Sequence, residues 1–252
     1  MKVASGMLAL LCALGRVEAQ EGEFQKQALQ KFHDTFDSAT AKDDDKAAAI
    51  VQLAQLKTPA TAKALVPVLT KSAVPFRMVA ARELAQFKGV SGASDALLSA
   101  LRSQSNLNDK ARSVRILALR GLGDLQARDA AGDVEKLLED RNEWIAKAAI
   151  DAAGKIRARS SVAALLVAFR RIEGPEGKNE ISVNPLEAEL PPTSLQGILK
   201  EERGRTKPVS SRDLLREPVL GALKSITCQE FATLRDWETW WRKSKSGFTV
   251  PE

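Results

Sequence analysis

The sequence predicts an all-α protein in which pairs of helices stack into an elongated array, and three observations predict it. Alanine is abundant and tyrosine is absent, a composition that favours closely packed helices over a β-sandwich. A pattern of apolar and small residues recurs at intervals of 31, 38 and 31 residues, which is typical of stacked helical repeats. Beyond residue 19 the chain has one cysteine, Cys228, so packing rather than an internal disulfide has to hold the fold together.

The first 19 residues have the features of a secretory signal peptide. Lys2 supplies a positive start, residues 3–15 are mostly apolar, and Val17-Glu18-Ala19 fits the small-x-Ala motif, with cleavage before Gln20. The apolar run is shorter than the roughly 20 residues that a bilayer requires. A lipoprotein signal through Cys12 is the alternative. We therefore expect a secreted or periplasmic protein with no membrane span after cleavage.

Residues 20–42 are expected to form an N-terminal capping helix. Phe24, Ala28, Phe32 and Phe36 follow one another at intervals of four residues, which places them along one side of an amphipathic helix. Helical arrays need such terminal caps to cover their last apolar face. The alternative is an anchoring helix that binds a partner.

Four leading helices are predicted between residues 43 and 173. In each, an alanine is followed four places later by an apolar residue or alanine, then by a small residue, and two places after that by another apolar residue. The four segments are AIVQLAQL from Ala49, AARELAQF from Ala80, ALRGLGDL from Ala118 and AIDAAGKI from Ala149. These positions share one helix face. The small residues of the four segments let a neighbouring helix approach closely; they are Ala54, Ala85, Gly123 and Gly154.

A second helix is expected after each leading helix, in TPATAKALVPVLTK, SGASDALLSALRS, RDAAGDVEKLLED and RSSVAALLVAFRRIE. Thr58 before Pro59 is a helix-start signal. Asn108 or Asp109 can cap the third leading helix and Asn142 the fourth. Pro67 is expected to kink or shorten its helix.

The paired helices resemble HEAT repeats. The Val114-Arg115 pair and Arg77 are similar to the valine and arginine of the HEAT leading helix. The resemblance covers roughly residues 43–173 and implies a right-handed α-solenoid of HEAT-like helix pairs with capping helices at both ends. It carries little information on function, since this fold serves many tasks.

Residues 174–212 break the pattern and are expected to be an irregular insert, either a disordered tether or a segment folded over the array. Residues 213–252 are expected to hold a degenerate fifth repeat, with Val219, Leu223 and Ile226 at the positions that are apolar in the other repeats. A tryptophan-rich C-terminal cap follows it.

The tryptophans lie on one side of a predicted helix that runs to about Lys245. Thr233 and Asp236 approximate a capping box at its start. Trp237, Trp240 and Trp241 are interpreted as a structural cap, and an exposed aromatic shelf for a sugar or peptide is the alternative.

The closing segment resembles the T-G-Q-x-F and W-x-x-W-W ending of exported bacterial HEAT proteins, which supports the cap. Cys228 stands where glycine is usual and would be strained at positive φ. We expect a partly buried thiol there; the alternative is an exposed thiol that links two chains.

Catalytic, cofactor-binding and metal-binding residues are not predicted, and we expect no enzymatic activity. The only histidine, His33, has no second histidine or paired cysteine to complete a zinc site. Asp43, Asp44 and Asp45 are interpreted as acidic residues that offset a helix dipole, with a calcium site as the weaker alternative.

The positive charge is concentrated in the repeats, where residues 43–173 hold 21 basic and 15 acidic side chains. One interpretation is arginines that brace adjacent repeats; the other is a basic ridge that binds an acidic partner. The candidate partner-binding residues are Arg77, Arg82, Arg112, Arg115, Arg120, Lys147, Arg157 and Arg159.

The functional hypothesis is therefore a non-catalytic exported scaffold that binds an unknown protein partner on its curved surface. The alternative is a binder of an anionic polymer, either an envelope polysaccharide or a nucleic acid, through the basic ridge. Aromatic residues are not interleaved with the basic ones, so stacking on nucleic-acid bases has no support.

Overall fold

The computed structural model describes residues 22–108, 111–174, 180–181 and 209–251. The expected signal peptide with Cys12, the candidate cap Asp109 and most of the 174–212 insert lie outside the described residues.

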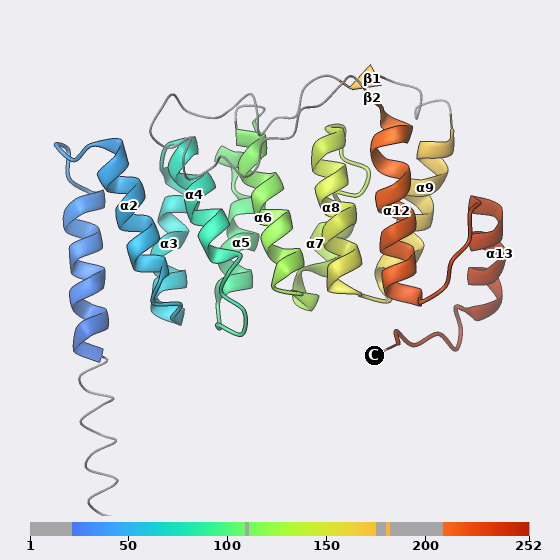
Figure 1. The fold of residues 1–252 in the computed structure, drawn as a ribbon, viewed down its shortest axis with the longest axis horizontal. Helices are drawn as coiled ribbons and strands as arrows, with labels where there is room; N and C mark the ends of the chain where they lie inside the picture. The colour runs from blue at the N-terminus through green and yellow to red at the C-terminus, as the bar shows by residue number, and fades with distance from the viewer. Residues whose placement is uncertain (1–21, 109–110, 175–179, 182–208, 252) are drawn as a thin grey trace, which may run out of the picture.

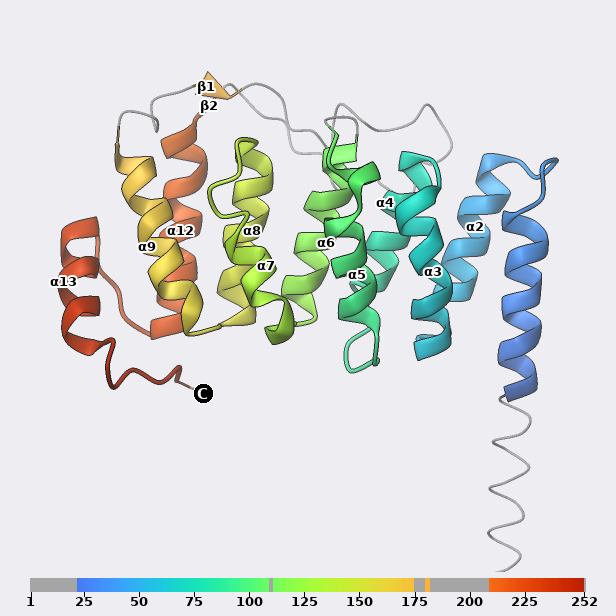
Figure 2. The same cartoon turned by 180° about the vertical axis from the view of Figure 1, so that it is seen from behind.

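The helices form two layers along a straight stack (Figure 1). The layer that faces the viewer in Figure 1 consists of the leading helices α2 (Asp43–Ala54), α4 (Val74–Leu84), α6 (Arg112–Asp124), α8 (Glu143–Ile156) and α12 (Ser211–Thr227). The layer behind it, which faces the viewer in Figure 2, consists of α3 (Pro59–Lys71), α5 (Ala93–Arg102), α7 (Ala131–Glu135), α9 (Ser160–Glu173) and α13 (Leu234–Ser244). Residues 22–36 are helical and stand at one end, beside α2.

This arrangement confirms the predicted all-α solenoid. Each leading helix packs on its neighbours in the same layer, as α6 does on α4 and α8. Besides helices, the described residues contain two short strands, β1 (Glu180–Ile181) and β2 (Val209–Ser210), which pair antiparallel where the 174–212 segment leaves and rejoins the stack.

The helix starts were partly predicted. Thr58 accepts a hydrogen bond from the Thr61 N–H, and Asn142 caps α8 by accepting from two backbone N–H groups. The prediction for Asn108 was wrong, because its amide donates to the carbonyl of Ser105 and α6 begins after Ala111 without a side-chain cap.

Two of the second helices also differ from expectation. Pro67 does not shorten its helix, since α3 continues to Lys71. The third is shorter than predicted: the 3-10 turn η3 (Arg128–Ala130) leads into α7, which ends at Glu135.

The small residues lie at the contacts between leading helices, as their spacing predicted. Gly123 is so close to α8 that a Cβ there would lie 3.0 Å from the Cα of Ala152. A Cβ on Gly154 would lie 3.0 Å from the Cα of Ala222 on α12. Such distances are tighter than ordinary Cβ contacts, so glycine at these two positions lets α6, α8 and α12 pack more closely than a larger residue would.

The apolar residues of the leading helices fill a core that continues along the stack. It includes Leu53 from the first repeat, Leu84, Leu122 and Ile156 from the next three, and Leu223 from α12. Because each pair of helices covers the next, the fold is stabilised by contacts between neighbouring repeats.

Candidate binding surface

An open groove crosses three consecutive leading helices and is the candidate binding surface. We call it the leading-helix groove; its volume is about 420 Å³. Its lining residues are Arg120 and Asp124 from α6, Asp151, Ala152, Gly154 and Lys155 from α8, and Pro218, Gly221, Ala222 and Ser225 from α12.

The floor of the groove is low because its residues are small. Gly154 and Ala222 are the pair whose close approach draws α8 and α12 together. Gly221 is exposed, and a Cβ added there would meet nothing within 4 Å. The Ser225 hydroxyl donates to the Gly154 carbonyl at 2.8 Å, which satisfies a polar group of the floor.

Charges of both signs line the groove and its edge. The Lys155 ammonium lies 2.7 Å from an Asp124 carboxylate oxygen and links α8 to α6. Lys147 and Asp151 form a second pair at 2.7 Å along α8. Exposed pairs of this kind contribute about 0–1 kcal/mol, so a partner can replace them at small cost.

Arg77 and Arg115 brace repeats instead of facing the groove. Arg77 Nη1 donates to the Ser105 carbonyl at 2.9 Å and to Asn106 Oδ1 at 2.7 Å, and burial lowers the pKa of its guanidinium below the ordinary value. Arg115 is 9% exposed and lies 3.1 Å from an Asp140 carboxylate oxygen.

Arg157 and Arg159 hold the C-terminal tail. Arg157 donates to the carbonyl of Pro251, and Arg159 donates to the carbonyl of Lys245. These bonds join the turn between α8 and α9 to the segment after α13, which returns beneath α12 in Figure 1.

The remaining predicted residues lie on the leading helices. Arg82 pairs with its neighbour Glu83 at 2.9 Å, and Arg112 is half-buried at the start of α6. Arg120 lines the leading-helix groove, and Lys147 lies one helical turn from Asp151 on its edge. The structure therefore does not gather the eight predicted residues into one ridge.

The tryptophans pack at the C-terminal end of the stack. Trp237 is 1% exposed, and its indole N–H donates to the Phe231 carbonyl at 3.0 Å. Trp240 and Trp241 are half-buried and contact Phe248 edge-on.

Cys228 departs from expectation in one respect. Its φ is 56° at the C-terminal end of α12, so this cysteine has the left-handed conformation in which a side chain is strained. The thiol is exposed, however, so the expected partly buried position was wrong.

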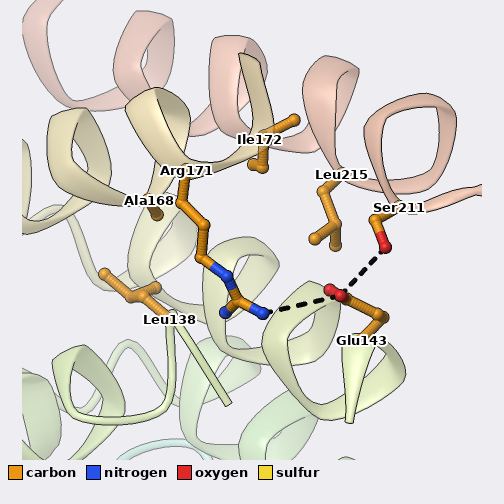
Figure 3. Close-up of a pocket in the computed structure, with 7 residues that line it drawn as sticks. All are labelled: Leu138, Glu143, Ala168, Arg171, Ile172, Ser211 and Leu215. Carbon is orange, nitrogen blue, oxygen red and sulfur yellow. Dashed lines mark hydrogen bonds and ion pairs between the residues drawn. The ribbon is translucent and has the colours of Figure 1, made fainter. Parts of the chain in front are cut away.

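A much smaller cavity lies where α8, α9 and α12 meet (Figure 3). Glu143 accepts a hydrogen bond from Ser211 at 2.9 Å and lies 3.7 Å from Arg171. The cavity volume is about 10 Å³, which is room for about one water molecule. This cluster fixes the start of α12 on the fourth repeat and is too small for a ligand.

No group of three or more His, Cys, Asp and Glu side chains that could hold a metal ion occurs among the residues that the structure describes. His33 is exposed, and its Nδ1 lies 3.1 Å from an Asp37 carboxylate oxygen. Within the same residues, no helix has the length and apolar content to span a bilayer.

Comparison with protein families identifies HEAT repeats in residues 104–176. The matched region runs from the short turn η1 (Gln104–Asn106) to just beyond α9 and covers the third and fourth helix pairs. Comparison with curated proteins gave no match. The helix pairs on either side of the matched region share its two-layer packing.

Proposed function

We propose that this chain is a non-catalytic, exported HEAT-repeat scaffold that binds another protein through the leading-helix groove. HEAT repeats commonly serve as protein-interaction scaffolds, and they are identified in this chain. One observation carries the proposal. Three successive leading helices line a single open groove, whose floor consists of small residues and whose sides carry both acidic and basic side chains.

The shape of the groove favours a protein over a small molecule. Small-molecule sites are enclosed, mostly apolar cavities, whereas this groove is open and lined by paired charges. Specific protein interfaces bury roughly 800 Å² on each partner, and in Figure 1 the leading-helix layer continues beyond the groove through α4 and α2.

Binding of an anionic polymer has less support from the geometry. Arg77, Arg115, Arg157 and Arg159 donate to groups of the protein itself. A polymer would have to compete with these internal partners. Export is the part of the proposal that rests on the sequence of residues 1–19 alone.

The test is affinity capture from the native envelope with a chain that starts at Gln20. Gly221→Gln places a long neutral side chain in the groove where nothing obstructs its Cβ. Gly132→Gln is the matched control, because Gly132 is also helical, exposed and unobstructed but lies on α7 in the other layer. We expect Gly221→Gln to lose the captured protein and Gly132→Gln to retain it.

Two further results would speak against the proposal. Equal capture by both glycine variants, with loss only when residues 175–211 are removed, would assign recognition to the insert. Retention on heparin that collapses between low and moderate salt, unchanged by Gly221→Gln, would favour the polymer binder.

A further inference from the structure

A second and larger groove lies at the N-terminal end of the stack, between the helical residues 22–36 and α2. We call it the N-terminal groove; its volume is about 890 Å³. Phe24, Ala28 and Phe32 line one wall, and Ala49 and Leu53 on α2 line the other together with Leu56, which follows the helix.

The helix that forms the outer wall is fixed to the stack. Phe36 contacts Phe76 of α4 edge-on, with ring centroids 5.6 Å apart, and Phe32 is 3% exposed. The Gln25 amide also donates to Thr58 Oγ1 at 2.8 Å. The groove therefore lies between two anchored helices.

Phe24 is the exception along this phenylalanine stripe, because 62% of it is exposed. The adjacent residue Gln25 donates a hydrogen bond to Thr58, which holds this turn of the helix against the stack. Phe24 is therefore exposed although its helix is packed at this position. Phe24 lines the groove together with the half-buried Ala28 and Leu56 and with polar residues such as Gln27 and Gln52.

The charge around the N-terminal groove is opposite to that of the repeats. Residues 22–48 hold six acidic and four basic side chains, whereas residues 49–173 hold twelve acidic and twenty basic ones. Asp34 and Asp45 line the groove together with Lys31. Asp43 and Asp44 add exposed carboxylates at the adjacent start of α2.

We propose that the N-terminal groove binds an amphipathic helical segment of a partner protein, with apolar residues on one face and Lys or Arg beside them. This inference rests on the proposed scaffold function and names one of its partner classes. A groove between two helices accepts a third helix whose apolar residues repeat every three or four positions. The acidic edge selects a basic segment by charge complementarity.

A second copy of the chain fits this groove poorly. A symmetric dimer through the same surface would place the edge with Asp34, Asp43, Asp44 and Asp45 against its own copy. Like charges in such an interface oppose association. The charge pattern thus favours a different, basic partner.

The experiment selects peptides of about 16 residues, or roughly four helical turns, from a random phage-displayed library on the chain starting at Gln20. We expect enriched peptides with apolar residues at helical spacing and a net positive charge. The best peptide is then synthesised and its Kd is measured by fluorescence anisotropy.

Two groove variants and one control test the assignment. Phe24→Ser removes the exposed ring, and Asp45→Lys reverses a charge on the edge; each is expected to weaken the peptide by about tenfold or more. Val167→Ser is the matched control, since Val167 is an exposed apolar residue on α9 far along the stack. It should leave the Kd unchanged. Circular dichroism checks that each variant is folded.

Several outcomes would overturn the inference. Enrichment of acidic or charge-neutral peptides would contradict the charge argument, and a Kd unaffected by Phe24→Ser would place binding elsewhere. A dimer seen by light scattering and abolished by Phe24→Ser would assign the groove to self-association. Any of these outcomes would refute the peptide-binding inference. If Gly221→Gln still abolishes the affinity capture of a partner protein, the proposed scaffold function stands nonetheless.

Discussion

Gly154 provides the sharpest test of how the leading helices nest. Gly154→Ala adds one Cβ to α8, and this atom would lie 3.0 Å from the Cα and 3.1 Å from the Cβ of Ala222 on α12. The nearest atom belongs to the backbone, so no side-chain rotation relieves the contact. The two helices have to move apart by a few tenths of an ångström.

Two opposing terms set the size of the effect. Overpacking of a well-packed contact costs roughly 1–3 kcal/mol, while replacing glycine by alanine within a helix contributes about 1 kcal/mol of stability. Gly221→Ala isolates the second term, because Gly221 is also helical, on α12, and nothing lies within 4 Å of the added Cβ. The difference between the two variants is therefore the overpacking cost alone.

The assay is urea unfolding followed by circular dichroism at the α-helical minimum. We expect Gly221→Ala to raise the free energy of unfolding by about 0.5–1 kcal/mol. Gly154→Ala should fall about 1–3 kcal/mol below it, which is a difference in Tm of about 2–12 °C for a chain of this size. Ala222→Gly combined with Gly154→Ala should restore only part of the loss, because the Ala222 Cα remains.

Equal stabilisation by Gly154→Ala and Gly221→Ala would refute this reasoning. It would mean that α8 and α12 have free space between them at residue 154. The small-residue column would then not be the reason for the close approach of the helices.

Three further predictions follow from the two ends of the stack and from one inter-repeat pair. Trp237→Ala should cost about 3–5 kcal/mol in urea unfolding, because Trp237 is fully enclosed; an effect below about 1 kcal/mol would contradict its place in the core. Cys228→Gly should stabilise the chain by about 1 kcal/mol because φ is 56°, whereas Cys228→Ser should not; equal effects would exclude backbone strain. The hydrogen bond from Arg102 lowers the pKa of Asp133 in the folded chain. Asp133→Asn should therefore reduce the free energy of unfolding at neutral pH, and this reduction should shrink as the pH falls below about 3.8, because the Asp133 carboxylate of the original chain is then protonated. A reduction that is constant with pH would argue against the pair.

The helical repeat was predictable because it depends on the spacing of residues that are close in the sequence. The alanine and glycine columns at Gly123 and Gly154 follow the helical period, and the structure places them at the contacts that this period implies. At Cys228 the sequence indicated only that a cysteine stands where glycine is usual and would be strained at positive φ; the structure gives φ 56° there. Each inference needed only the residues of one helix and its neighbour.

The surfaces were not predictable in the same way. Arg77 and Arg157 are basic residues in the repeats, and the sequence does not show that their partners are a carbonyl 28 residues away and the carbonyl of Pro251. Likewise, the phenylalanine stripe gives no sign that Phe24 stays exposed while Phe32 is buried. Both facts depend on how distant segments meet.

Hydrogen–deuterium exchange of the free chain tests most directly whether the helix pairs share one interior. We expect slow exchange in the central turns of α4, α6, α8 and α12, and faster exchange across the whole of α8 and α12 when Gly154 is replaced by leucine. Rapid exchange throughout the leading helices of the unmodified chain, or protection that is indifferent to the size of residue 154, would contradict this expectation.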